Sequence, residues 1–334
     1  MALEQAVRIV DEDASGIDRA FRDDVLKGLS QVQKAVPARW FYDARGSRLF
    51  EDITRTPEYY PTRAETEILR AAGVEFLSRV GAGRAVVEFG SGSSAKTPLL
   101  LEAIAPAAYV PIDISGDFLR ESAESLAQAF PDLATFPIEA DFTKPVTLPA
   151  AVAGMPRLGF FPGSTIGNLV PRTAVDLLRQ MRDTLGNDGS GQACAQLLIG
   201  MDRIKDPDIL IAAYDDKGGV TAAFNRNLLT RINNELGGDL PVDKFVHRAV
   251  WNDDIARIEM HLEAVEPLQF SICEQSFFMA KGETIHTENS HKYDRRSAAA
   301  LLLAGGWTPI TRWTDGDERF MVILAEASPL RTAP

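Results

Sequence analysis

The segment VVEFGSGSS (86–94) joins an apolar run to a loop of glycine and serine. Gly90 and Gly92 can adopt positive φ and let the main chain approach a ligand closely. The same pattern also suits a tight turn between a strand and a helix, so the loop alone does not define a ligand. Glu88, directly before the loop, would repel a pyrophosphate and attract a cationic ligand.

Two acids follow the next apolar segments, Asp113 in YVPIDIS and Asp141 in ADF. An acid at the end of the second strand of a nucleotide-binding sheet accepts hydrogen bonds from ribose hydroxyls, and Asp141 is placed to accept one from an adenine amino group. Loop and acids together predict an adenosine-containing ligand, although both aspartates could instead cap the segments that follow them. S-adenosylmethionine carries a sulfonium and an ammonium, so it suits the E-x-G-x-G loop better than a dinucleotide with its pyrophosphate. A dehydrogenase is the alternative.

The elements that must position these residues alternate from residue 85 onward. Strands are predicted at 85–89, 108–114, 134–142, 158–163 and 195–201, with helices at 96–104, 117–130 and 174–185 between them. This alternation is typical of an α/β fold in which helices cover both faces of a doubly wound parallel sheet. Ligands bind such sheets at the carboxyl ends of the strands.

The pattern differs at the beginning of the chain and after Met201. Helices are predicted at 17–35 and from Thr62, which would be the N-cap, with an irregular aromatic segment at 39–63 between them. After Met201 come helices at 205–216 and 220–238 and short alternating strands at 247–252, 257–265, 268–272 and 276–280. A helix at 297–307 and a strand at 319–327 could return to the first sheet. We therefore predict a Rossmann-type domain of 61–200 and 287–334, and an α+β substrate domain of 1–60 and 201–286.

Composition narrows the class of protein. The 334 residues include 47 acidic and 35 basic side chains, a net charge of −12 that disfavours nucleic acid as a partner. No apolar run approaches the roughly 20 residues of a membrane span, and the acidic start of the chain is not typical of a secretory signal. The only cysteines, Cys194 and Cys273, favour a reducing compartment, so a cytoplasmic protein is expected. The four histidines show no metal-ligand spacing; we expect no metal and a structural role for His286 and His291.

Several motifs together resemble one family, the histidine Nα-methyltransferases of ergothioneine biosynthesis. The resemblance extends from RWFYD at 39 to the last strand and is carried by VEFGSGSS, YVPIDIS, ADF, GFFPGSTIGN, AAYDD, TAAFNRNLLTRIN, RIEMHL and IHTENSHKY. It implies a class I methyltransferase fold with a second domain built from the N-terminal segment and an insertion. It also implies transfer of three methyl groups from S-adenosylmethionine to the α-amino nitrogen of L-histidine, giving hercynine. Only the segment 186–196, expected to be a surface loop, departs from the pattern.

The resemblance also implies roles for individual residues. The residues implied to bind the cofactor are Tyr42, Gly90, Lys96, Asp113, Asp141 and Phe142. The residues implied to bind the substrate are Tyr59, Asn168, Tyr214, Met260, Glu288 and Ser290. Of these, Tyr59 and Asn168 are the expected catalytic residues. Each residue also has an ordinary interpretation as a core aromatic, a turn residue or a surface charge. We expect a monomer acting on a small molecule; the alternatives are an N-methyltransferase of another amino acid or histidine derivative, and a non-catalytic protein that binds an adenosine ligand.

Overall fold

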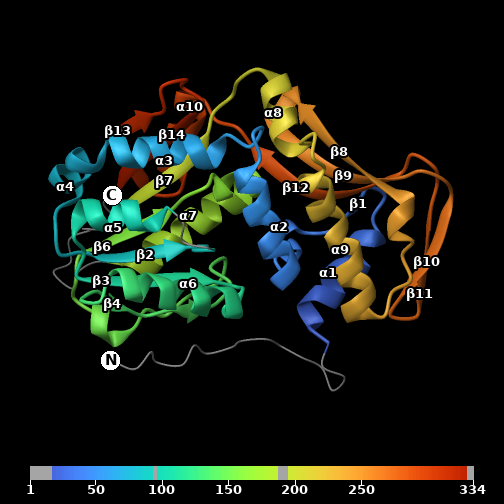
Figure 1. Ribbon diagram of the computed structural model, residues 1–334, viewed down its shortest axis with the longest axis horizontal. Helices are drawn as coiled ribbons and strands as arrows, with labels where there is room; N and C mark the ends of the chain where they lie inside the picture. Colours follow the sequence, from blue (N-terminus) through green and yellow to red (C-terminus); the bar gives the residue numbers. More distant parts are fainter. Residues whose placement is uncertain (1–16, 93–95, 187–194, 329–334) are drawn as a thin grey trace, which may run out of the picture. The chain divides into compact units, whose positions relative to one another are not determined.

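The computed structural model describes residues 17–92, 96–186 and 195–328 (Figure 1). The N-terminal stretch 1–16, part of the glycine loop at 93–95 and the segment 187–194 of the expected surface loop lie outside the described residues. The chain divides into two compact units. Among the described residues, the first unit comprises those between 61 and 204 and those from 291 onward, and the second comprises those up to 60 and those between 205 and 290.

The first unit is built on an eight-stranded sheet of order β13-β14-β7-β6-β2-β3-β4, with β5 also paired to β3. The central strands β2, β3 and β6 and their neighbours β4, β5 and β7 run parallel, and β13 and β14 are antiparallel additions at one edge. This confirms the predicted doubly wound α/β fold. The strands are β2 (Ala85–Phe89), β3 (Ala108–Asp113), β4 (Ala134–Thr135), β5 (Ile138–Glu139), β6 (Arg157–Phe161), β7 (Gln196–Asp202), β13 (Trp307–Thr314) and β14 (Phe320–Ala327).

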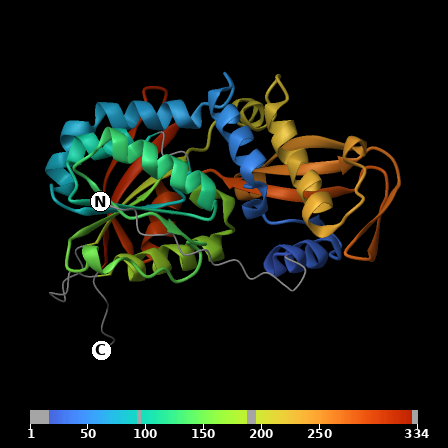
Figure 2. The same cartoon turned by 60° about the horizontal axis from the view of Figure 1, so that its bottom comes forward.

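Helices lie on both sides of this sheet (Figure 2). Every residue of β2 is buried, as expected for a central strand that packs against helices on both faces. One layer of the core combines Val87 and Phe89 of β2 with Leu178 and Leu302 from helices. The helices are α3 (Pro61–Ala71), α4 (Gly73–Val80), α5 (Thr97–Ile104), α6 (Gly116–Ala129), α7 (Pro171–Leu185) and α10 (Arg295–Ala304), with 3-10 turns η2 (Ala150–Val152) and η3 (Thr165–Asn168).

The second unit contains a four-stranded sheet of order β1-β12-β9-β8 and the hairpin β10-β11. Strand β9 alternates buried and half-buried residues, the pattern of a sheet with one covered face. The strands are β1 (Lys34–Ala35), β8 (Phe245–Asn252), β9 (Arg257–Ala264), β10 (Leu268–Ile272), β11 (Gln275–Met279) and β12 (Thr284–His291). The helices are α1 (Arg19–Leu29), α2 (Ala44–Arg55), α8 (Pro207–Tyr214) and α9 (Val220–Leu236), with 3-10 turns η1 (Ala38–Phe41), η4 (Val242–Lys244) and η5 (Asp253–Ile255).

The structure corrects several local expectations. The helix expected to have Thr62 as its N-cap begins at Pro61, because proline is well suited to the first helical position. The strand predicted at 134–142 is divided into β4 and β5, since Pro137 between them has no N–H for the ladder. The aromatic segment 39–63 contains the regular helix α2, which begins after Asp43, whose carboxylate accepts from the Gly46 N–H at 2.6 Å.

The second unit extends to Ser290, so the return to the first unit comes later than the expected residue 287. Glu288 and Ser290 consequently belong to the second unit, on β12. Among the helices that the structure describes, none is long and apolar enough to cross a membrane.

Candidate functional site

Gly90 lies where β2 ends, next to an aromatic ring. Its φ of +72° is in the left-handed region, and its N–H donates to the Ile112 carbonyl at 2.8 Å. A Cβ at this position would lie 3.2 Å from the Phe142 ring, which packs edge-on against Phe161. Glycine is therefore required both by the backbone conformation and by the close approach of this ring. Two of the predicted cofactor residues, Gly90 and Phe142, are thus brought together.

Asp113 ends β3 and is tied to the glycine loop. One carboxylate oxygen accepts from the Gly92 N–H and the other from the Ser115 N–H, each at 2.9 Å. Burial raises the pKa of this carboxyl, although these main-chain donors oppose the rise. A carboxylate has about four acceptor positions, so Asp113 is held in one orientation with capacity left for further donors.

Asp141 follows β5 and takes part in a local turn. Its Oδ1 accepts from the N–H of Thr143 at 3.0 Å and from the hydroxyl of Thr143 at 2.5 Å. Its Oδ2 lies 3.9 Å from the Lys144 ammonium. This is the turn-forming behaviour of an aspartate, so the capping role that the sequence left open is present for one of its two oxygens.

Lys96 precedes α5 and forms an ion pair that the sequence did not predict. Its Nζ contacts the carboxylate of Glu65, a fully buried residue of α3. The same carboxylate accepts from the Gly163 N–H at 3.1 and 2.9 Å. The sequence pattern assigned no role to Glu65; its only local sign of burial is the apolar face that it shares with Ile68 and Leu69.

Glu88 has a different role from the one expected. The residue is 1% exposed, and its carboxylate accepts from the Tyr109 hydroxyl at 2.5 Å and from the Thr97 hydroxyl at 2.8 and 3.0 Å. Burial raises the pKa of this carboxyl from 4.5 to about 7, against the lowering effect of both hydroxyls. Glu88 is therefore an interior acid beneath the glycine loop, not a free carboxylate offered to a cationic ligand.

Asn168 ends the 3-10 turn η3, which follows β6. The turn is locked in place by Ser164, whose φ is +58° and whose hydroxyl accepts from the Asp202 N–H at 2.9 Å. Gly167 allows the main chain of His291 to approach, since a Cβ there would lie 2.8 Å from the His291 carbonyl oxygen. The PGSTIGN motif is thus a rigid support that places Asn168 at the carboxyl end of β6.

In the second unit the structure connects three of the predicted substrate residues. The hydroxyls of Tyr214, at the end of α8, and Ser290, on β12, share a hydrogen bond of 2.6 Å. The rings of Tyr59 and Tyr214 meet edge to face, with centroids 6.2 Å apart. Glu288 is half-buried on the same strand as Ser290. Met260 on β9 is buried, and its carbonyl accepts from the Thr287 hydroxyl at 3.1 Å.

Tyr214 has a support that the sequence did not indicate. Its carbonyl accepts from His247 Nε2 at 2.8 Å, and the other ring nitrogen faces the Asn225 amide at 2.8 Å. Burial lowers the pKa of His247, so the ring is a neutral donor. A lone histidine in a strand carries no such signal in sequence, because its two partners lie on other elements.

Tyr42 is the predicted cofactor residue that belongs to the second unit. Its ring packs against Phe50 and Phe224, with centroids 5.8 and 5.9 Å away, and Phe50 in turn contacts Tyr59. Locally this is the arrangement of a core aromatic.

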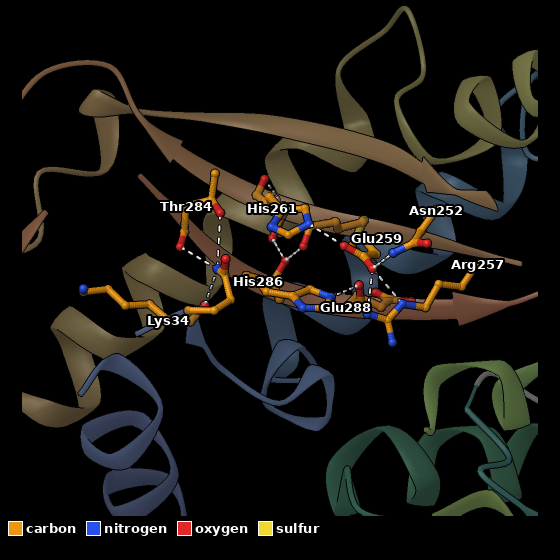
Figure 3. A network of polar contacts seen from close by, with 12 residues as sticks. Lys34, Asn252, Arg257, Glu259, His261, Thr284, His286 and Glu288 are labelled. Carbon is orange, nitrogen blue, oxygen red and sulfur yellow. Dashed lines mark hydrogen bonds and ion pairs between the residues drawn. The ribbon is translucent and has the colours of Figure 1, made fainter. Parts of the chain in front are cut away.

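One group among the described residues has the composition of a metal site. Potential ligand atoms of Glu259, His261 and His286 all lie within 4.8 Å of one another (Figure 3). Glu259 accepts from Arg257, Asn252 and His261, so its oxygens already have donors. The expectation that the protein needs no metal stays a prediction.

A glycine loop and acids at the carboxyl ends of parallel strands are the features of an S-adenosylmethionine-dependent class I methyltransferase, and this is the class of enzyme that the chain represents. Residues 21–327 match the family described as "Histidine-specific methyltransferase, SAM-dependent", and the chain belongs to that family.

Two similar proteins, both named histidine N-alpha-methyltransferase, cover nearly the whole chain. The one from Mycolicibacterium smegmatis is 39% identical over 318 residues, 93% of this chain and 96% of the relative. The one from Mycobacterium tuberculosis is 40% identical over 320 residues, 94% of this chain and 96% of the relative. Among solved structures, an S-adenosylmethionine-dependent methyltransferase from Clostridium acetobutylicum aligns with a TM-score of 0.48 at 9% identity, covering 84% of this chain and 98% of that one.

Proposed function

We propose that this enzyme transfers three methyl groups from S-adenosylmethionine to the α-amino nitrogen of L-histidine, giving hercynine, the first step of ergothioneine biosynthesis. The observation that carries the proposal is the 39–40% identity to two histidine N-alpha-methyltransferases along more than nine-tenths of both chains. The described residues supply matching chemistry in both units.

S-adenosylmethionine supplies a methyl group on a sulfonium, and its adenosine part fits the residues at the ends of β2, β3 and β5. Asp113 would accept from the ribose hydroxyls with the oxygens that Gly92 and Ser115 hold in place. Gly90 leaves the side of the Phe142 ring unobstructed by a Cβ. Asp141, Lys96 and Tyr42 complete the proposed cofactor set.

The proposed substrate set would hold histidine at both ends. Asn168 and Tyr214 are assigned to its carboxylate, and Glu288 and Ser290 to the two ring nitrogens. Tyr214, assigned to the substrate carboxylate, and Ser290, assigned to the imidazole, share a hydrogen bond of 2.6 Å. Met260 would line the imidazole pocket, and the face of Tyr59 would tolerate the growing positive charge on the nitrogen.

The chemistry makes modest demands on acid–base groups. A free α-amino group titrates near pH ~8, so a useful fraction is neutral at physiological pH and a strong base is unnecessary. In-line attack instead depends on presenting the nitrogen in one place, which is where most of the rate acceleration would arise. We therefore assign Tyr59 and Asn168 a role in orienting the amine.

The direct test is incubation with S-adenosylmethionine and each of the twenty amino acids, followed by mass spectrometry. Mass gains of one, two and three methyl groups on histidine alone are expected. Methylation of a different amino acid, with histidine unchanged, would replace the proposal by its alternative, an N-methyltransferase of another substrate. Cofactor binding without any methylation would indicate the non-catalytic alternative.

Glu288→Ala tests the assignment of the imidazole site. A hydrogen bond to a charged group contributes about 1.5–3 kcal/mol, so histidine affinity should fall about tenfold to a hundredfold. Titration calorimetry should show nearly unchanged binding of S-adenosylmethionine. Glu263→Ala is the matched control, since Glu263 is an acid of β9 whose partner is Arg248 at 3.0 Å. Equal losses for both ligands would argue against the role.

We also propose a cytoplasmic, monomeric enzyme that needs no metal ion, nucleic acid or membrane. The net charge of −12 supports independence from nucleic acid, and the presence of only two cysteines supports a reducing compartment. Light scattering of the purified protein and assays in the presence of a chelator would test the monomer and the independence from metal.

A further inference from the structure

A chain of polar contacts in the second unit leads from the end of β8 to the main chain of Glu288 (Figure 3). Its first part is centred on Glu259 of β9. One carboxylate oxygen accepts from Arg257 Nε at 2.7 Å and from the Asn252 amide at 3.0 Å, and Arg257 Nη2 lies 2.6 Å away. The other oxygen accepts from His261 Nε2 at 3.1 Å. Burial would raise the pKa of Glu259, but these donors outweigh it and hold the pKa near 2.

The second part of this chain is a pair of stacked imidazoles. The rings of His261 on β9 and His286 on β12 lie with centroids 4.7 Å apart and planes 23° from parallel. His286 Nε2 donates to the carbonyl oxygen of Glu288 at 3.0 Å. Burial and the neighbouring His261 lower the pKa of His286, so a neutral ring carries its single proton on the nitrogen that faces this carbonyl.

The hydrogen bond from His286 to the Glu288 carbonyl lies where the pairing of β12 with β1 ends. Strand β1 pairs with only two residues of β12, Ile285 and His286, and the Val36 N–H then donates to the His286 carbonyl at 3.0 Å. Carbonyls of alternate residues in a strand point to the same side, so the carbonyl of Glu288 points to the side on which β1 has ended. The imidazole of His286 supplies an N–H donor at that position.

We propose that His286 is a positioning residue that sets the affinity for histidine by holding the main chain of Glu288. The inference rests on the proposed function, in which the Glu288 carboxylate binds the substrate imidazole. His261, itself fixed by Glu259, holds the ring plane of His286 through the stack. The orientation of the Glu288 side chain then follows from a main chain anchored on its own strand.

A metal ion held by Glu259, His261 and His286 is the competing role for the same side chains. The contacts favour positioning, because the guanidinium of Arg257 already lies 2.6 Å from a carboxylate oxygen of Glu259. A divalent cation at that carboxylate would be repelled by this positive charge. His261 Nε2 is also directed at the carboxylate and carries the proton between them.

The test compares ligand affinities of His286→Phe and His286→Gln with those of the wild type. Phenylalanine keeps an aromatic ring against His261 but lacks the donor, and glutamine offers an amide N–H. Loss of one hydrogen bond predicts a two- to tenfold weaker binding of histidine to His286→Phe, with binding of S-adenosylmethionine unchanged. His286→Gln should recover part of the loss. Because His286 acts through Glu288, adding His286→Phe to Glu288→Ala should cause no further loss.

Three results would overturn the inference. The first is wild-type histidine affinity in His286→Phe, and the second is an equal weakening of both ligands, which a general loss of structure would cause. The third is a stoichiometric metal in the purified enzyme that His286→Phe and Glu259→Gln both lose. Absence of any histidine methylation by the wild type would instead refute the proposed function itself, so the two failures are distinguishable.

Discussion

Replacing Glu88 with glutamine should make the stability of the protein less dependent on pH. Glu88 is 1% exposed, and burial raises its pKa from 4.5 to about 7. Folding therefore favours the protonated carboxyl. The associated stabilisation is fully present below about pH 4.5 and is lost as the pH rises through about 7.

The magnitude follows from the two pKa values. One pKa unit corresponds to about 1.4 kcal/mol of free energy. Ionising Glu88 therefore costs the folded state about 3 kcal/mol at high pH. About 2–3 kcal/mol of this stability is lost between pH 5 and pH 8. Glutamine has no such cost. It can keep the contacts, because Tyr109 and Thr97 both donate to the same oxygen of Glu88, at 2.5 and 2.8 Å.

The assay is urea unfolding of wild type and Glu88→Gln at pH 5 and pH 8 without ligands. Comparing the two proteins cancels the contributions of other titrating groups. We expect the variant to gain about 2–3 kcal/mol relative to the wild type when the pH is raised from 5 to 8. A constant difference between the two proteins at both pH values would refute the reasoning.

The remaining predictions concern the cofactor and the core of the first unit. Asp113→Asn should weaken S-adenosylmethionine binding by about tenfold or more, because it removes a charged acceptor that two main-chain donors hold at 2.9 Å. Calorimetry should show that histidine binding is largely intact. An unchanged affinity for S-adenosylmethionine would contradict the assignment. Lys292→Met removes the ammonium that lies 2.8 Å from the Asp202 carboxylate in a fully buried pair. It should lower the free energy of unfolding by about 3–5 kcal/mol, measured by chemical denaturation, whereas the double replacement with Asp202→Leu should cost less; an equal or larger cost for the double variant would contradict this account.

Local sequence patterns were sufficient for most of the sheet. AVVEF is apolar and ends at glycines, and β2 occupies those residues, Ala85–Phe89. Strand β13 (Trp307–Thr314) was not predicted, because its sequence WTPITRWT mixes apolar and polar residues around a proline, and the register shifts at this point. The helix α2 was missed because aromatic and turn residues obscure its apolar face.

Some residues of the candidate site were likewise predicted from sequence motifs, whereas others were identified only in the folded structure. Motif positions carried the assignments of Gly90, Asp113 and Glu288, whose residue types are informative where they stand. They could not indicate that Glu65 supports Lys96, or that His286 supports Glu288 within a network based on another strand. Such roles depend on partners that the chain brings near only when it folds.

What the amino-acid sequence determined by itself is the alternation of elements, the position of the glycine loop and the family to which the chain belongs. Only the tertiary structure decided which acids are interior and which are available. Glu88 was expected to be available to a cationic ligand and Glu65 was assigned no role, yet both are buried against hydroxyl, amide or ammonium donors. The physical reason is that desolvation and hydrogen-bond partners are set by contacts such as that between Glu65 and Gly163, 98 positions apart, which no local pattern encodes.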